Sequence, residues 1–178
     1  FEKTICSYTS SNYSVLTNSA TSALHISCLA LGLSKGDILW TSPNSYVASA
    51  NVGLLCNAKV DFVDIDPENY NMCPTALSIK LKNAEKLGQL PKIVMPVHFA
   101  GQSCDMIKIK KLSEKYGFKI IEDASHAIGG SYNNTKIGSC RFSDITVSSF
   151  HPVKIITTAE GGCAITNNDE IFEKLKLL

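Results

Sequence analysis

An aspartate and a lysine, each placed at the end of an apolar strand-like run, are the residues of this sequence best suited to chemistry. Asp123 ends the run 118–123, and Lys154 follows the run 144–150 after a turn that contains Pro152. A carboxylate buried at such a position needs a cationic partner. In pyridoxal phosphate enzymes, a lysine forms a Schiff base with the cofactor and a carboxylate partners its pyridinium nitrogen. The pair predicts this chemistry if the two strands are neighbours.

Further groups follow other predicted strands and could complete such a site. Residues 18–21 are small and open a helix, where backbone N–H groups and the helix dipole favour a phosphate. The Ser149 hydroxyl could hold the same phosphate, Tyr46 could stack on a planar ring, and His126 could reach the same ligand. Each group alone also fits an ordinary role as helix cap, packing aromatic or core histidine. The prediction therefore depends on their conjunction, in which Lys154 is more than a solvated loop lysine.

Composition narrows the class of protein. The 178 residues suit one large domain, 1–178, and the formal net charge of +1 with interspersed signs argues against a nucleic-acid partner. No apolar run approaches the roughly 20 residues of a membrane span, and no signal peptide is recognisable. The seven cysteines are odd in number and form no C-x-x-C pair, which argues against both a disulfide framework and a metal site. A reducing cytoplasm is the expected location.

Strand-like and helix-like runs alternate along the chain, which predicts an α/β fold with three α/β/α layers and a mostly parallel sheet. The expected strands are 14–17, 37–42, 59–65, 92–99, 119–123, 144–150 and 162–166. The expected helices are 21–31, 46–57, 75–87, 106–116 and 170–178, with a small hairpin at 130–138. Only the eleven residues 151–161 join the last two strands, fewer than a parallel crossover requires. The seventh strand is therefore expected to be the one antiparallel strand.

Five segments in order resemble the DegT/DnrJ/EryC1/StrS family of nucleotide-sugar aminotransferases. They are 18–25, 63–67, 96–102, 121–126 and 149–162. Two more segments, 40–51 and 98–106, are similar to the members of this family that act in pseudaminic acid biosynthesis. One departure is Ala159, where many relatives carry glycine.

The resemblance implies a fold, a cofactor and residue roles. The fold is the large domain of the fold type I transferases, and the cofactor is pyridoxal 5'-phosphate. Lys154 carries the cofactor and is the catalytic residue, while Asp123 pairs with its ring nitrogen. The remaining cofactor-binding roles fall to the phosphate ligands Ala20, Thr21 and Ser149, the stacking Tyr46 and, by the phenolic oxygen, His126.

The resemblance also implies the reaction and the partners. The expected reaction transfers an amino group from an amino acid, with glutamate as the expected donor, to a 4-keto nucleotide-linked deoxysugar. Relatives are homodimers with shared active sites and are considerably longer than this chain. The sequence lacks an initiating methionine and stops inside a helical pattern. We expect a fragment without the opening helices and the C-terminal small domain.

Three alternatives remain open. Some relatives are sugar dehydratases, but these carry histidine at the position of Lys154. Another fold type I enzyme could act on amino acids, although such enzymes commonly clamp carboxylates with arginine and Arg141 is the only arginine here. The chain could also be a cofactor-binding remnant without activity.

Overall fold

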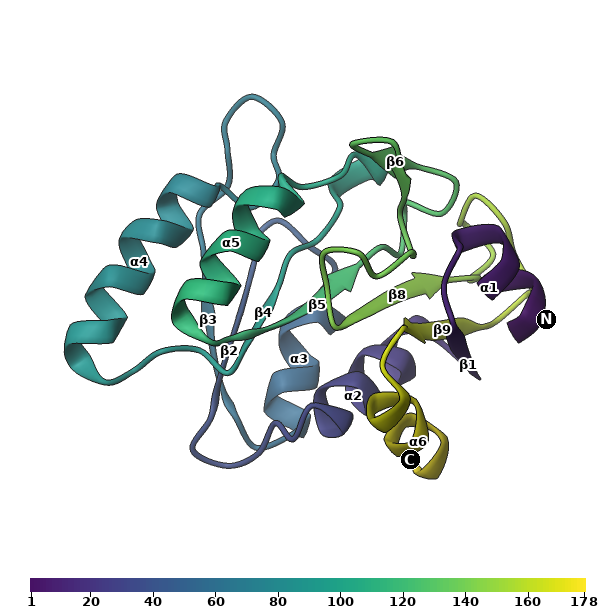
Figure 1. The fold of residues 1–178 in the computed structure, drawn as a ribbon, viewed down its shortest axis with the longest axis horizontal. Helices are drawn as coiled ribbons and strands as arrows, with labels where there is room; N and C mark the ends of the chain where they lie inside the picture. Colours follow the sequence, from purple (N-terminus) through teal and green to yellow (C-terminus); the bar gives the residue numbers. More distant parts are fainter.

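The computed structural model describes all residues from 1 to 178, and its centre is one sheet with helices on both faces (Figure 1). The seven strands of the sheet are β1 (Tyr13–Thr17), β2 (Ile38–Thr41), β3 (Lys59–Phe62), β4 (Ile93–Met95), β5 (Lys119–Asp123), β8 (Ile145–Ser149) and β9 (Gly162–Thr166). The helices are α1 (Glu2–Thr9), α2 (Ala20–Ala30), α3 (Ala48–Leu55), α4 (Pro74–Leu87), α5 (Met106–Tyr116) and α6 (Asp169–Leu177). The three-layer architecture predicted from the alternation of elements is confirmed.

The order of strands across the sheet is β1-β9-β8-β5-β4-β2-β3. β9 runs antiparallel to both of its neighbours, β1 and β8, and every other pair in the sheet is parallel. The single antiparallel strand is therefore the final one, as the short connection before it predicts. β5 and β8 are adjacent and parallel, so the carboxyl ends that carry Asp123 and the Lys154 segment meet at one edge.

Both faces of the sheet are buried, and consecutive side chains of a strand enter different cores. Leu39 and Ile121 pack in the cluster formed with α2, α3 and α6. Their neighbours Trp40 and Ile120 pack in the cluster formed with α4 and α5. Figure 1 shows α4 and α5 side by side, away from α2 and α3. This double burial explains why the strands read as continuous apolar runs rather than alternating ones.

Several boundaries differ from the predicted ones. Helix α1 is not predicted, because it has no side-chain cap and its apolar residues are few. β4 stops at Met95, since Pro96 cannot donate to a ladder, and a 3-10 turn η1 (Phe99–Gly101) replaces the end of the predicted strand. α3 begins at Ala48 rather than at residue 46. The predicted hairpin is confirmed as β6 (Ser131–Tyr132) and β7 (Thr135–Lys136).

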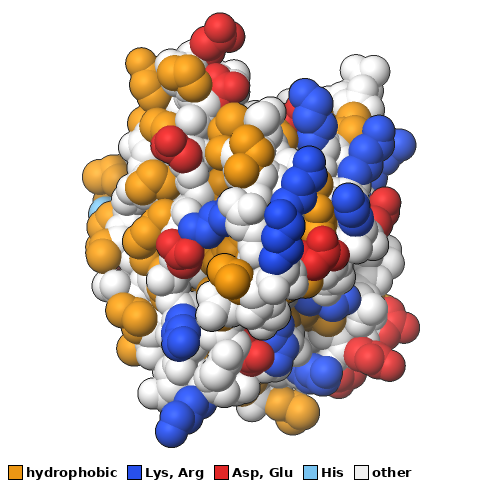
Figure 2. All heavy atoms as spheres, turned by 90° about the vertical axis from the view of Figure 1, so that its left-hand side faces the viewer, with side chains coloured by type: hydrophobic (Ala, Val, Ile, Leu, Met, Phe, Trp, Pro, Cys, Tyr) orange, Lys and Arg blue, Asp and Glu red, His pale blue; other side chains and the backbone are white.

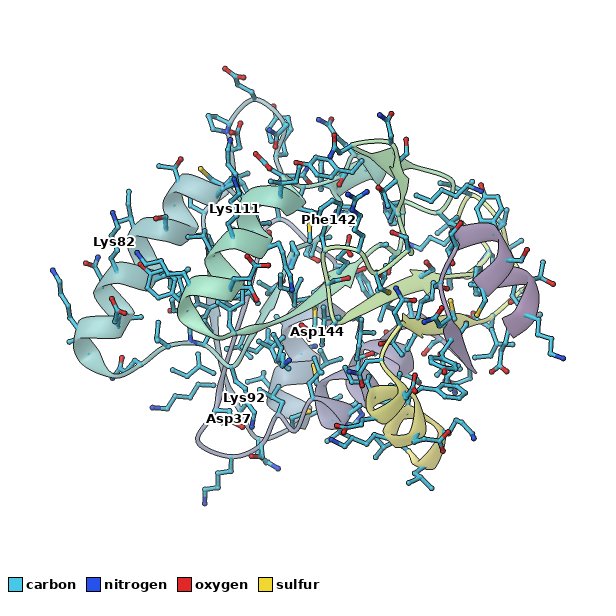
Figure 3. All side chains as sticks on the ribbon, in the orientation of Figure 1. Asp37, Lys82, Lys92, Lys111, Phe142 and Asp144 are labelled. Atoms are coloured by element: carbon cyan, nitrogen blue, oxygen red, sulfur yellow. The ribbon has the colours of Figure 1, made fainter.

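Ion pairs occupy the edge of the sheet where the parallel strands begin. Asp37 pairs with Lys92 at 2.8 Å, and the two side chains lie together in Figure 3. Lys119 at the start of β5 pairs with Asp144 just before β8 at 3.1 Å. A second cavity of about 580 Å³ opens at this edge, and the Asp37–Lys92 pair is part of its lining. The charges named here are therefore already matched by neighbours in the fold.

On the face seen from the α4 side, lysine and acidic side chains are mixed (Figure 2). None of the helices is long and apolar enough to cross a membrane. No group of three or more histidine, cysteine, aspartate or glutamate side chains could hold a metal ion, and all seven cysteines are free thiols.

Candidate active site

A cavity of about 630 Å³ lies at the carboxyl ends of the parallel strands, where ligands collect in sheets of this kind. Its walls come from the segments that follow β1, β2, β4, β5 and β8. All seven site residues predicted from the sequence line it: Ala20, Thr21, Tyr46, Asp123, His126, Ser149 and Lys154. The fold therefore gathers into one space the residues that the sequence separates widely.

The carboxylate of Asp123 is buried and faces this cavity. Its side chain accepts the Ser49 hydroxyl at 2.7 Å and the Ser125 N–H at 3.1 Å. No lysine, arginine or histidine forms an ion pair with it, although the residue is only 4% exposed. A buried carboxylate with two donors and no cation retains the capacity to accept from a cationic N–H group.

Two serines that the sequence does not single out extend from Asp123 to the cavity. Ser49 is 1% exposed, and its hydroxyl is 2.7 Å from that of Ser45, which lines the cavity. Ser49 lies in the first turn of α3 and Ser45 three residues before the helix, and the turn between them brings the two hydroxyls together. The spacing of four residues is the only feature of the sequence that could have pointed to these serines. Serine is so common near helix starts that the spacing predicts little unless the contact with Asp123 is known.

Lys154 enters the cavity from a tight turn after β8. The Lys154 N–H donates to the His151 carbonyl at 2.9 Å, which places Pro152 at the second position of the turn, where its fixed φ fits. Partial burial lowers the pKa of the Lys154 ammonium, and the nearby charge of Asp123 opposes part of this shift. A lysine with a lowered pKa is more readily a free amine, as nucleophilic and base chemistry require.

His126 lies against the same amine. Its Nε2 is 2.5 Å from Lys154 Nζ, and burial followed by the lysine charge lowers the pKa of the imidazole. Two positive charges this close repel each other, so the contact favours loss of a proton from one of the two groups. The structure thus joins His126 to Lys154, a contact that no pattern in the sequence indicates.

An anion-binding corner stands at the start of α2. Ala20 and Thr21 are the first two residues of this helix, and N–H groups in that position have no partner within a helix. Ser19 caps the helix by accepting the Ser22 N–H at 3.2 Å. The buried Ser149 hydroxyl lines the same cavity, where its only hydrogen bond is a 3.5 Å contact from the His151 N–H. These groups can donate together to a phosphate.

Gly162 lets the start of β9 approach this corner closely. A Cβ at Gly162 would lie 2.6 Å from the Ser19 carbonyl carbon and 2.7 Å from the Ala20 Cα. These are backbone atoms, which cannot move without moving the N-terminus of α2. Gly162 is therefore a packing requirement of the anion-binding corner.

Gly162→Ala is expected to displace the N-terminus of α2. Overpacking of this kind costs about 1–3 kcal/mol, so the midpoint of thermal unfolding should fall. The dissociation constant for a phosphate-bearing ligand should rise by about 10-fold, because the donors move off their positions. Calorimetry and ligand titration measure the two effects.

Cys163→Ala is the matched control, since Cys163 faces the opposite core beside Ile5. Equal ligand affinities in wild type and Gly162→Ala would contradict the assignment of this corner.

Tyr46 lies at the mouth of the cavity. It is 75% exposed and precedes α3 by two residues, so it is not a helical residue as predicted. It lines the cavity, and its ring does not stack on another aromatic ring of the chain. Its ring is therefore available to stack on a planar ligand.

Comparison with known proteins finds relatives of the whole chain. A UDP-4-amino-4,6-dideoxy-N-acetyl-beta-L-altrosamine transaminase from Campylobacter jejuni is 42% identical to this chain, with alignment over 100% of the chain and 46% of the relative. Among solved structures, the Helicobacter pylori aminotransferase PseC, involved in the biosynthesis of pseudoaminic acid, superposes with a TM-score of 0.86 at 36% identity, over 99% of this chain and 46% of that one. NtdA from Bacillus subtilis, solved with bound cofactor PMP, gives a TM-score of 0.87 at 31% identity, over 98% of this chain and 38% of that one.

The chain thus spans less than half the length of the relatives it matches. The resemblance to the pseudaminic acid enzymes, expected from segments 40–51 and 98–106, is confirmed by the first two of them. The model of the DegT/DnrJ/EryC1/StrS aminotransferase family matches residues 1–178, the whole of the sequence. The chain belongs to the DegT/DnrJ/EryC1/StrS aminotransferase family.

Proposed function

We propose that the chain is the cofactor-binding large domain of a pyridoxal phosphate-dependent sugar aminotransferase. The observation that carries this proposal is the buried Asp123, which lacks an ionic partner and shares one cavity with Lys154. Membership in a family of aminotransferases supports the same function. In the other large cavity both carboxylates, Asp37 and Asp61, are paired with lysines, so it offers no group comparable to Asp123.

The residues of the cavity fit the parts of this cofactor. Asp123 has spare acceptor capacity for a protonated ring nitrogen, and the start of α2 with Ser149 provides donors for a phosphate. Lys154 would hold the cofactor through its amine, with Tyr46 over the ring and His126 beside the amine. PMP, the cofactor bound in the Bacillus subtilis relative, is the aminated form of pyridoxal phosphate.

When bound, pyridoxal phosphate supplies an electron sink for charge that develops at a carbon beside an amino nitrogen. The carboxylate of Asp123 accepts the hydrogen bond that keeps the ring nitrogen protonated. Once its amine is free of the cofactor, Lys154 Nζ, with its lowered pKa, would be the base that accepts a proton from carbon and later returns it. His126, whose pKa is lowered by burial and by the charge of Lys154, adds no second positive charge beside that amine.

The proposed substrates follow from the relatives. The Campylobacter jejuni relative is named for a UDP-linked amino sugar, and the Helicobacter pylori relative for pseudoaminic acid. We therefore propose a 4-keto nucleotide-linked deoxysugar as acceptor and an amino acid, glutamate first, as donor. The relatives are more than twice as long as the part matched here, and we propose that the full-length protein has a small domain outside residues 1–178 and forms a homodimer with shared active sites.

The test of cofactor binding uses borohydride. Purified protein incubated with pyridoxal phosphate should develop a visible absorption band, which borohydride reduction should abolish. Peptide mass spectrometry should then place the added cofactor mass on Lys154, because this amine has the lowered pKa and lies in the cavity. Modification spread over the surface lysines, without preference for Lys154, would refute the proposed site.

A turnover assay with a 4-keto nucleotide sugar and glutamate separates an enzyme from a cofactor-binding remnant. The assay should use the full-length protein, since relatives extend well beyond the length matched here. Cofactor bound at Lys154 with no transfer to any keto sugar would favour the remnant.

A further inference from the structure

One fully buried titratable group outside the proposed cofactor contacts is the imidazole of His98. Its side chain has no exposed surface, and its Nε2 is 2.8 Å from Glu122 Oε2. Its Nδ1 accepts the Cys104 N–H at 3.1 Å. Burial lowers the pKa of the His98 imidazole, but the contacts with Cys104 and Glu122 outweigh burial and raise it above its usual range. The Cys104 N–H donates to Nδ1, and the Nε2 side of the ring faces Glu122.

Glu122 is the partner that fixes this ring, and both of its carboxylate oxygens accept hydrogen bonds. Burial would raise the pKa of Glu122, but hydrogen bonds from His98, Ser143 and Thr146 lower it below the usual range. The side chain lies on the opposite face of β5 from Asp123, as alternation along a strand requires. Because the two residues are consecutive on β5, the hydrogen bonds that fix Glu122 on one face of the sheet also fix the backbone that carries Asp123 on the other face.

The segment that carries His98 is also hydrogen-bonded to the backbone of Asp123. The Asp123 N–H donates to the Pro96 carbonyl at 2.9 Å, and the His98 N–H donates to the Asp123 carbonyl at 3.0 Å. Val97 and Asp123 form an isolated parallel bridge beyond the end of β4. Residues 96–98 therefore extend the pairing of β4 with β5 by one position, and that position is Asp123, the residue proposed to face the cofactor.

The same segment continues into the wall of the cavity. After His98 the chain turns through η1, where Ala100 has φ 52° and Gly101 has φ 88°. A Cβ at Gly101 would lie 2.7 Å from the His126 carbonyl oxygen, so this turn packs directly on the backbone of another cavity residue. Phe99 and Ala100 line the cavity.

We propose that His98 is a positioning residue for the site. Its imidazole, held between Glu122 and the Cys104 N–H, fixes segment 96–101, and this segment sets the positions of Asp123 and His126 at the cavity. The proposal rests on the proposed function, because what His98 positions is the set of groups assigned to the cofactor. His98 is itself among the residues that line the cavity, but both of its ring nitrogens are engaged by Glu122 and Cys104, so it is not assigned a contact with the cofactor.

Two variants at His98 separate its hydrogen bonds from its bulk. His98→Leu removes both ring contacts and leaves Glu122 short of one donor. His98→Gln can still donate to Glu122 from its amide and serves as the conservative variant. His25→Leu is the matched control, since His25 makes no side-chain hydrogen bond and does not line the cavity.

The first readout is amide hydrogen exchange of the intact protein, which needs no cofactor. The peptide to follow spans 118–126, because it contains Asp123 and is bonded to the segment that His98 fixes. In His98→Leu this peptide should exchange about 10-fold faster than in wild type, whereas peptides from β2 and β3 should be unchanged. In His98→Gln and His25→Leu the protection of 118–126 should match wild type.

The second readout is the visible absorption of the protein loaded with pyridoxal phosphate. His98→Leu should raise the dissociation constant for the cofactor by about 10-fold and shift the pH midpoint of the band, because Asp123 no longer aligns with the ring nitrogen. His98→Gln should bind within about 3-fold of wild type. Uniform loss of protection with unchanged cofactor affinity and pH midpoint would show a merely structural role and overturn the proposal.

Two further outcomes keep the proposal decidable. If His98→Leu does not fold, Glu122→Ala takes its place, because it removes the acceptor of the same hydrogen bond. Wild-type protection of 118–126 together with wild-type cofactor affinity in Glu122→Ala would then overturn the proposal. If wild type binds no cofactor, the proposed function fails, and the exchange comparison still decides whether His98 holds Asp123.

Discussion

Replacement of Lys154 by alanine is expected to abolish amino transfer while leaving the fold intact. Lys154 is half-exposed to the cavity on a turn after β8, and it makes no ion pair within the chain. Its loss removes the proposed covalent attachment and the base together. Since general-base catalysis alone contributes up to about 10⁴-fold, kcat should fall by roughly that factor or more. Steady-state assay of the full-length protein with keto sugar and glutamate measures it.

The control for Lys154→Ala is a lysine far from the cavity. Lys111 serves, because it lies on α5, as Figure 3 shows, and does not line the cavity. Lys111→Ala should retain wild-type turnover, and both variants should unfold at wild-type temperature. Addition of a small primary amine should restore part of the activity of Lys154→Ala, since it replaces the missing base. Retained turnover in Lys154→Ala without an added amine would contradict the assignment of this residue.

The elements of this fold follow from the sequence because both faces of the sheet are buried. Runs such as Ile120-Ile121 must be apolar at consecutive positions to enter two cores at once, so each strand is visible in the sequence. The antiparallel direction of β9 is likewise predictable, because the connection from β8 is too short for a parallel crossover. Helix α1 escapes prediction because eight residues with no cap carry too weak a pattern.

The candidate site is predictable only in part. Asp123 and Lys154 stand out because a carboxylate and a lysine at the ends of apolar strands are unusual, and strand adjacency then joins them. Ser49 and His98 give no such signal, since their roles exist only through partners far along the chain: Ser49 is 74 residues from Asp123, and His98 is 24 from Glu122. A sequence shows which groups are costly to bury, but the hydrogen bonds that make the burial possible depend on packing.

Replacement of Asp123 by asparagine is expected to have the second largest effect. The amide keeps the volume, its oxygen can accept the Ser125 N–H, and its NH2 can donate to the Ser49 hydroxyl, so the fold should be preserved. It cannot match the positive charge of a protonated ring nitrogen, and a hydrogen bond to a charged group contributes about 1.5–3 kcal/mol. Loss of about 3 kcal/mol corresponds to roughly 100-fold in rate. Turnover of the full-length variant and cofactor titration measure the two consequences.

The neighbouring carboxylate provides the discriminating comparison for Asp123→Asn. Glu122→Gln changes a carboxylate to an amide one residue away on the same strand, but on the face that holds His98. If the charge acts on the cofactor, Asp123→Asn should shift the pH dependence of the visible band much more than Glu122→Gln, because Asp123 faces the cavity and the amide oxygen introduced by Glu122→Gln can still accept from His98. Equal shifts in both variants would mean that the charge of the strand end, and not a hydrogen bond from Asp123, sets the protonation of the ring. The alternation of side chains along β5 therefore makes one strand supply both the proposed cofactor partner and the group that holds it in position.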